Sequence, residues 1–303
     1  MKIVKKIRIR TLPEDYSYNN DFANFISPRP NKFIVPQDWC VLTASSKNHF
    51  VGFQLLYSSL FITHRVQIVL FNLGLTDKQL NWCKKQKRLI VLNYFNTHIN
   101  THYWEAWHKP MYIMQCPFKK IIWIDSDAVF KGNLNYIIHM AESNPFFTSD
   151  HSEDPTITFN TSQLYKYMPI NGFKEDTHPC LNTGLFVIDK IRDKTLLQEW
   201  GYIVTEALYS SQIQDNISCW DQGACKWVLQ NLGLIHCINP NMAFNQPALD
   251  RQQLYPAVKE AVLQLFYNIM QLKDAFLVHW MGSDNGRKPW HYWGETLNLD
   301  YSL

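Results

Sequence analysis

The feature that most constrains this chain is a series of short apolar runs separated by segments with helical character. The run at Lys120–Asp125 holds Ile121, Ile122, Trp123 and Ile124 in succession. An apolar run without alternation is typical of a strand buried on both faces, as in a mostly parallel sheet covered by helices. We therefore expect an α/β fold with a mostly parallel central sheet flanked by helices.

The other elements predicted from periodicity continue this alternation. Strands are expected at Trp39–Ala44, Val66–Phe71, Leu89–Asn93, Pro145–Ser149, Gly184–Ile188, Leu234–Ile238 and Ala275–Trp280. Helices are expected at Gly52–Ile62 (amphipathic), from Thr76 onward, and at Lys194–Tyr209, Asp221–Asn231 and Pro256–Met270. Thr76 followed three residues later by Gln79 matches a capping box, which marks a helix start.

The first 36 residues differ from the rest, because they contain four prolines and many Asn and Ser residues without sustained periodicity. We predict an N-terminal extension over 1–36 and one domain over 37–303. The alternation at Ile3–Arg10 predicts an edge strand, with a basic anchor toward anionic lipid as the alternative.

Composition and charge narrow the classes of function. Hydrophobic residues make up 46% of the chain and the net charge is +3. Five of the cations fall in the first ten residues, which leaves 24 basic and 26 acidic residues elsewhere, so a basic face for nucleic acid is not expected. The longest apolar runs fall short of a membrane span, so at most peripheral membrane contact is expected.

The seven cysteines are odd in number and form no Cys-x-x-Cys spacing. This pattern predicts neither a zinc site nor a disulfide framework, and favours reduced, mostly buried thiols in a cytoplasmic protein. Attachment to the inner membrane face and a secreted effector are the alternatives for location.

The tripeptide Asp125-Ser126-Asp127 follows the buried run directly. Residues i and i+2 of extended backbone point the same way, so the two carboxylates are expected to converge past the end of the strand. Such anions repel unless a cation lies between them, and Mg²⁺ or Mn²⁺ fits carboxylate ligands. The alternative is a surface turn, where Asp and Ser are common.

A second polar segment begins at His279, at the end of another apolar run. Its imidazole is a candidate third ligand for the same ion, against the alternative of a core histidine. Gly282 and Gly286 permit close backbone approach to phosphates, and Lys288 supplies a positive charge for a phosphate anion.

Together these segments resemble glycosyltransferase family eight, which includes glycogenin and the lipopolysaccharide galactosyl- and glucosyltransferases. The resemblance covers roughly residues 39–293. It rests on five motifs in order: Thr43-Ala44-Ser45-Ser46-Lys47-Asn48, Ile122–Phe130 around the Asp-x-Asp segment, Leu181–Ile188 around Asn182-Thr183-Gly184, Trp220-Asp221-Gln222, and His279-x-x-Gly282 ending in Lys288-Pro289-Trp290. Asn182-Thr183-Gly184 and Trp200 also resemble family thirty-four, a galactosyl/xylosyltransferase family with the same fold.

The resemblance implies a GT-A fold, with a Rossmann-like nucleotide-binding half, and a role for each matching residue. It implies Mn²⁺ (or Mg²⁺) ligation by Asp125, Asp127 and His279, and a nucleoside pocket lined by Thr43, Ala44, Ser45 and Asn48. Further donor-binding residues would be Lys109, Ser126, Asp150, Asn182, Gly184, Asp221, Gln222, Gly282 and Lys288. Five residues separate Gly282 from Lys288 where the family has two or three, so Arg287 is an alternative to Lys288.

Some of these residues also have ordinary structural explanations. Asn182 and Asp221 are common in turns and helix caps, Lys109 before Pro110 is typical of a solvated loop charge, and Gln222 of an exposed first turn.

The expected activity is transfer of a hexose from a UDP-sugar to an acceptor hydroxyl with retention, with Gln222, Asp221 and Lys288 as the catalytic residues. The acceptor is a glycan, a lipid-linked sugar or a protein. The alternatives are a sugar-nucleotide pyrophosphorylase or nucleotidyltransferase, a glycoside hydrolase and a non-catalytic carbohydrate-binding protein. The sequence leaves the donor sugar and the acceptor open.

Overall fold

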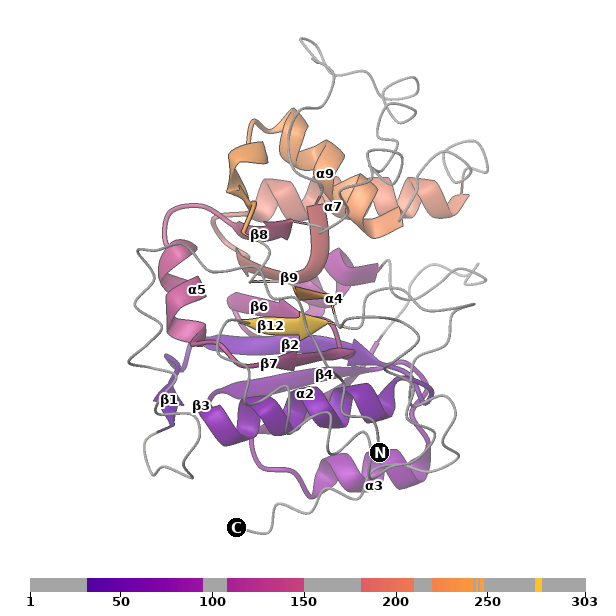
Figure 1. Cartoon of the computed structure of the whole chain (residues 1–303). Coiled ribbons are helices and arrows are strands. Elements are labelled where there is room, and N and C mark those ends of the chain that lie inside the picture. Colours follow the sequence, from indigo (N-terminus) through magenta and orange to yellow (C-terminus); the bar gives the residue numbers. More distant parts are fainter. Residues whose placement is uncertain are drawn as a thin grey trace, which may run out of the picture.

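A computed structural model describes residues 32–94, 108–149, 181–209, 220–241, 244, 246–247 and 276–279. A seven-stranded sheet with the order β10-β8-β9-β6-β2-β4-β5 forms its centre (Figure 1). The strands are β2 (Trp39–Ser45), β4 (Gln67–Asn72), β5 (Leu89–Asn93), β6 (Lys120–Ile124), β8 (Phe146–Ser149), β9 (Leu181–Asp189) and β10 (Ile238–Asn239). Only β9 runs antiparallel to its neighbours β6 and β8, so the predicted mostly parallel α/β sheet is confirmed.

Helices cover both faces of this sheet (Figure 1). One face packs against α4 (Lys109–Gln115), α7 (Lys194–Tyr209) and α9 (Trp220–Asn231), and the other against α2 (Phe50–Thr63), α3 (Asp77–Lys84) and α5 (Leu134–Met140). In β6, Ile121 and Trp123 pack into the core on the face covered by α4, α7 and α9, while Ile122 and Ile124 pack into the core on the opposite face. Burial on both faces is therefore the reason that this strand is a continuous apolar run.

Two small sheets complete the described part of the chain. In the first, β12 (Leu277–His279) pairs antiparallel with β7 (Ala128–Phe130) and parallel with β11 (Gln246–Pro247). In the second, β1 (Phe33–Ile34) pairs parallel with β3 (His64–Arg65). Val35, just after β1, is already buried in the core, while the predicted domain boundary at residue 37 stays a prediction.

The prediction that Gly52–Ile62 is amphipathic is wrong. The helix α2 is buried on nearly all sides, because it lies between the large sheet and β7. Its buried hydroxyls bond to backbone groups: Ser58 donates to the Gln54 carbonyl (2.5 Å), and Ser59 Oγ accepts the amide N–H of Phe130 (3.0 Å). Polar residues in this helix therefore bond to backbone instead of marking a solvent face.

The predicted strand at Leu234–Ile238 is also largely wrong. Gly233 has a φ of +69°, which ends α9, and the Leu234 amide donates back to the Leu229 carbonyl (2.7 Å). A 3₁₀ turn over Ile235–Cys237 follows, and only Ile238–Asn239 forms a strand. The turn at the end of α9 and the 3₁₀ turn after it keep residues 234–237 from forming a strand.

Other local predictions hold where the structure describes them. Thr76 and Gln79 form the capping box, with Thr76 Oγ1 accepting the Gln79 amide (3.3 Å) and Gln79 Oε1 accepting the Thr76 amide (2.9 Å). Five cysteines are free and buried: Cys40, Cys83, Cys116, Cys225 and Cys237. The predicted elements at Ile3–Arg10 and Pro256–Met270 lie outside the described residues. No described helix has the length and apolar character needed to cross a membrane.

Candidate functional site

The site is built around the end of β6. Beyond Ile124, the Asp125 amide still donates to the Gly184 carbonyl of β9 (2.9 Å), which holds Asp125 against the sheet. Ser126 is buried, and the chain then enters β7 at Ala128. In the antiparallel pairing of β7 with β12, Ala128 is the partner of His279, so the histidine arrives beside Asp127.

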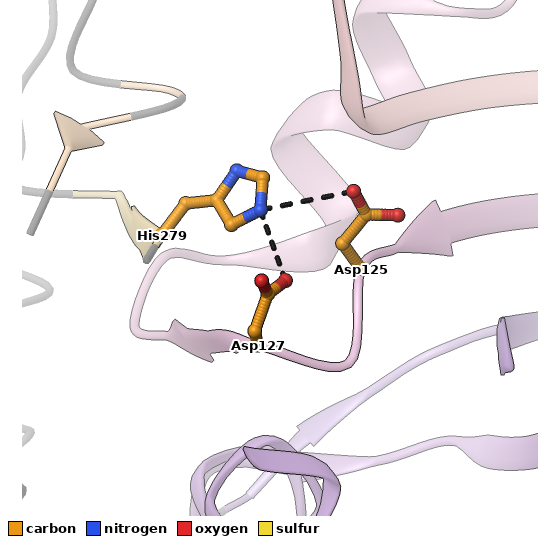
Figure 2. A group of neighbouring side chains, drawn as sticks. All are labelled: Asp125, Asp127 and His279. Carbon is orange, nitrogen blue, oxygen red and sulfur yellow. Dashed lines mark hydrogen bonds and ion pairs between the residues drawn. The ribbon is translucent and has the colours of Figure 1, made fainter. Parts of the chain in front are cut away.

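Asp125, Asp127 and His279 face one another, as Figure 2 shows. The His279 Nε2 atom lies 3.0 Å from Asp127 Oδ1 and 3.7 Å from Asp125 Oδ2. One ligand atom from each residue lies within 4.8 Å of the others. The predicted convergence of these three residues is confirmed.

This donor set fits a hard divalent cation. Adjacent ligands of an octahedral ion about 2.1 Å away lie roughly 3 Å apart. The 3.0 Å between His279 Nε2 and Asp127 Oδ1 matches this spacing, and Asp125 Oδ2 lies farther, 3.7 Å from the same nitrogen. Two carboxylates and one imidazole suit Mn²⁺ or Mg²⁺ in an open site. His279 is 5% exposed, so its ring is held in place by the surrounding structure.

Lys109 occupies the centre of a buried ionic network, so its assignment to a solvated loop is wrong. Its Nζ lies 3.1 Å from Asp125 Oδ1 and 3.0 Å from Asp221 Oδ2, and it donates to the Thr183 carbonyl (3.0 Å). Burial disfavours the charged ammonium, but the Asp125 and Asp221 carboxylates outweigh it, so the pKa of Lys109 is raised above its usual value. The lysine is therefore a permanent internal cation.

Thr183 links this network to the start of α9. Its hydroxyl donates to Asp221 Oδ2 (2.6 Å), and its amide donates to Gln222 Oε1 (3.0 Å). Asp221 and Gln222 thus face β9, which rules out the explanation of Gln222 as an exposed first-turn residue. The sequence analysis did not predict that Thr183 connects these residues. Its place between Asn182 and Gly184 was the signal that could have indicated it.

Gly184 is required by a close approach of side chains. A Cβ at this position would lie 2.5 Å from His279 Cε1 and 2.8 Å from Asn182 Oδ1. Asn182 Oδ1 accepts the Gly184 amide (2.7 Å), so Asn182 belongs to β9 and is no turn residue. Gly184 therefore leaves the space that His279 fills.

Trp123 also touches the site, which the sequence reasoning missed. Its indole Nε1 donates to Asp125 Oδ1 at 2.6 Å. The ring stacks between Tyr112 and Phe186, with centroid distances of 6.1 and 5.9 Å. The spacing i, i+2 along β6 places Trp123 and Asp125 on the same side, and this was the available signal.

Three of the predicted nucleoside residues, Thr43, Ala44 and Ser45, form the end of β2 at the same carboxyl edge of the sheet. Thr43 is buried and its Oγ1 has no hydrogen-bond partner among the described residues. Ser45 Oγ donates to the Ser46 carbonyl (3.3 Å), Ala44 is half-buried and Asn48 is exposed in the following turn. Their role in binding stays a prediction. Asp150, Gly282, Arg287 and Lys288 lie outside the described residues.

The fold, together with the position of the site at the carboxyl edge of the sheet, defines the structural class of this protein. The structure has the GT-A fold of glycosyltransferases. It aligns with the apo structure of WbbM, a bifunctional glycosyltransferase, at a TM-score of 0.53 and 12% identity, over 82% of this chain and 47% of that one. It aligns with the galactosyltransferase LgtC in complex with donor and acceptor sugar analogs at a TM-score of 0.50 and 14% identity, over 84% of this chain and 91% of that one.

These likenesses confirm the predicted fold. This chain spans about half the length of the WbbM chain. No protein-family model matches the sequence, and no curated protein matches it either. Membership of family eight or thirty-four stays a prediction.

Proposed function

We propose that this protein is a metal-dependent glycosyltransferase that moves a hexose from a UDP-sugar to an acceptor hydroxyl with retention of configuration. The observation that carries the proposal is the convergence of Asp125, Asp127 and His279 at the carboxyl edge of a GT-A sheet. Ligands bind at this edge in open α/β sheets. The acceptor would be a glycan, a lipid-linked sugar or a protein side chain, in the cytoplasm or at the inner face of a membrane.

The three converging residues would hold Mn²⁺, or Mg²⁺ as the alternative. When bound, the ion supplies positive charge to the diphosphate of the leaving UDP. The contacts between Lys109 and the carboxylates of Asp125 and Asp221 favour a fixed, preorganised site.

The donor sugar would lie against β9 and the start of α9. Asn182, Gly184, Asp221 and Gln222 would surround it, with Gln222 stabilising the sugar instead of acting as a strong nucleophile. The acceptor hydroxyl would attack the anomeric carbon from the side of the departing phosphate, and a phosphate oxygen would take its proton. Thr43, Ala44, Ser45 and Asn48 would line the nucleoside, and Gly282 and Lys288 the diphosphate.

The alternatives explain the site less well. A glycoside hydrolase needs two carboxylates that flank the scissile bond, about 5–10 Å apart. Here the two carboxylates and the imidazole offer ligand atoms within 4.8 Å of one another, an arrangement suited to one cation. A carbohydrate-binding protein would not require this cluster, and a pyrophosphorylase would require a Gly-rich phosphate loop after the first strand.

The decisive experiment is a screen of UDP-sugars for UDP release, with Mn²⁺, with EDTA, and with Mn²⁺ restored after EDTA. We expect release from at least one UDP-sugar that EDTA abolishes and Mn²⁺ restores. The product anomer, read by NMR, should match the donor. If no UDP-sugar gave UDP release or thermal stabilisation, this result would count against the proposal. An inverted product would refute retention.

Substitution of the ligands tests the site directly. Asp127→Asn and His279→Ala should each weaken Mn²⁺ binding by about 100-fold or more, because each removes one of only three protein ligands. Electron paramagnetic resonance of Mn²⁺ measures the affinity, and circular dichroism checks the fold. His236→Ala, at an exposed histidine, is the matched control. A His279→Ala protein that binds Mn²⁺ and UDP normally would show that the site lies elsewhere.

A further inference from the structure

A cluster of cations lies at the edge of the sheet opposite the candidate site. It comprises Lys32, Arg65, Lys87 and Arg88, and we call it the basic patch. Lys32 precedes β1, Arg65 ends β3, and Lys87 and Arg88 come directly before β5. In Figure 1, β1 and β3 lie at the edge from which the β2 arrow starts, whereas Asp125 follows the end of β6.

Two of these cations, Lys32 and Arg88, lie over one aromatic ring. The Lys32 Nζ atom lies 4.1 Å from the centroid of the Phe61 ring, and the Arg88 guanidinium carbon lies 4.7 Å from it. Burial, and then the charges of Arg88, Arg65 and Lys87, lower the pKa of Lys32. Positive charges are therefore close enough here to repel one another.

Three of the four cations, Lys32, Arg65 and Arg88, are not neutralised by the described part of the chain. The Arg88 guanidinium donates to the carbonyl oxygens of His64 (2.6 Å) and Phe61 (3.5 Å), which are neutral acceptors. None of the ion pairs among the described residues involves Lys32, Arg65 or Arg88. Among the described residues, Lys32, Arg65 and Arg88 thus contribute positive potential that no carboxylate cancels.

Two exposed isoleucines border the basic patch. Ile34 is 66% exposed and is the parallel register partner of Arg65, so the two side chains project from the same face. Ile62, near the end of α2, is 41% exposed. Apolar side chains beside a cluster of cations are typical of surfaces that lie in the interface of a membrane.

We propose that the basic patch, with Ile34 and Ile62, docks onto an anionic phospholipid surface. Lipid phosphates would bind the cations and the isoleucines would enter the boundary with the acyl chains. Nucleic acid would satisfy the cations but offers the isoleucines no apolar phase.

This orientation leaves the candidate site free, because Asp125 and His279 lie at the opposite edge of the sheet. The inference does not depend on the proposed activity. Variants of the basic patch should leave Mn²⁺ and UDP binding unchanged, which separates a failure of one proposal from a failure of the other.

The test is co-sedimentation of the full chain with vesicles of phosphatidylcholine alone or with about one-third phosphatidylglycerol. Wild type should bind only the anionic vesicles, more weakly as salt rises. Each Lys or Arg near an anionic bilayer contributes about a fivefold factor in binding, so Arg65→Glu with Lys87→Glu should weaken partitioning by about 25-fold or more. Lys194→Glu, at an exposed lysine on α7, is the matched control and should bind as wild type does.

A second pair of changes tests the apolar part. Ile34→Ser with Ile62→Ser keeps every charge and should still weaken binding to anionic vesicles several-fold, with a fold confirmed by circular dichroism.

Equal binding of R65E/K87E and wild type would overturn the proposal, since both retain the basic first ten residues. The proposal would equally fail if wild type did not bind the anionic vesicles, or if the basic patch bound a short RNA or DNA more tightly than lipid at the same salt concentration.

Discussion

At the scale of single residues, the Asp125 carboxylate has two differently occupied oxygens. Its Oδ1 accepts from the Trp123 indole (2.6 Å) and lies 3.1 Å from Lys109 Nζ, while Oδ2 accepts from Lys109 Nζ (3.3 Å) and lies 3.7 Å from His279 Nε2. The indole ring cannot turn easily, because it stacks between Tyr112 and Phe186. Trp123 therefore orients the carboxylate so that Oδ2 faces the candidate ion.

This orientation leads to a prediction for Trp123→Phe. The change keeps the aromatic stack but removes the N–H donor, so Mn²⁺ affinity should fall about 10- to 100-fold while the fold is retained. Titration of Mn²⁺ by electron paramagnetic resonance measures the affinity, and Trp39→Phe, at another buried tryptophan, is the control. Unchanged Mn²⁺ affinity would mean that the indole hydrogen bond plays no part in ligand orientation.

The close approach at Gly184 leads to a second prediction. Gly184→Ala places a methyl group where the His279 ring lies, so the ring or β9 must move and Mn²⁺ binding should weaken at least tenfold. Gly201→Ala is the matched control, because its Cβ would make only ordinary contacts, with the end of the flexible Met114 side chain (3.4 Å) and with Pro110 Cβ (4.0 Å). That control should be neutral or stabilising by up to about 1 kcal/mol. Isothermal titration calorimetry and thermal unfolding measure both properties.

At the scale of elements, a buried histidine joins α2 to α5. The Thr63 hydroxyl donates to the Ser59 carbonyl (2.7 Å), so it accepts from His64 Nδ1 (2.6 Å). His64 Nε2 in turn accepts the Leu134 amide at the start of α5 (3.2 Å). Acceptance at Nε2 requires the neutral ring protonated at Nδ1, and burial, followed by the charge of Arg88, lowers the pKa of His64 to about 3.

Stability should therefore depend on pH through His64. Because the folded pKa lies below the unfolded value of 6.5, the unfolded state binds the proton first as pH falls. The contribution is complete above about pH 6.5 and declines toward pH 3, by about 1.4 kcal/mol per pH unit at most. Urea unfolding near pH 7 and pH 5.5 measures this decline. His64→Gln should be less stable near pH 7 and should show a shallower decline; an equal slope in both proteins would exclude His64 as the cause.

At the scale of the whole molecule, Lys109 connects elements that are distant in the sequence. It belongs to α4 and contacts Asp125 after β6, Thr183 on β9 and Asp221 on α9. These contacts tie the metal ligands to the residues that would surround the sugar. The network thus couples the two halves of the candidate site to the stability of the fold.

Lys109→Met should destabilise the protein by about 3 kcal/mol, because it leaves two neighbouring carboxylates without their cation. Urea unfolding measures the loss, and Lys119→Met, at an exposed lysine, is the control. Adding Asp221→Asn to Lys109→Met should recover part of the stability, since one of the unpaired charges is then removed. A Lys109→Met protein as stable as wild type would show that the network contributes little.

Local patterns in the sequence determined the positions of several strands, one helix start and the two carboxylates at the end of β6. The apolar runs placed β2, β4 and β6 within a residue or so, because a strand buried on both faces must be apolar throughout. The run at Leu89–Asn93 also placed β5, although this edge strand is only partly buried. The Thr76–Gln79 capping box was readable because it joins residues only three apart. The spacing of Asp125 and Asp127 predicted two carboxylates at one strand end for the same local reason.

Tertiary structure alone decided which distant residues meet. His279 reaches Asp127 because β12 pairs with β7 in the register that sets it opposite Ala128. Lys109 is buried because α4 packs on the sheet where carboxylates of two other elements converge, and the basic patch forms because β1 and β3 bring Lys32 near Arg88. Periodicity reports which side of an element is buried, whereas register and packing between elements fix what each buried side contacts.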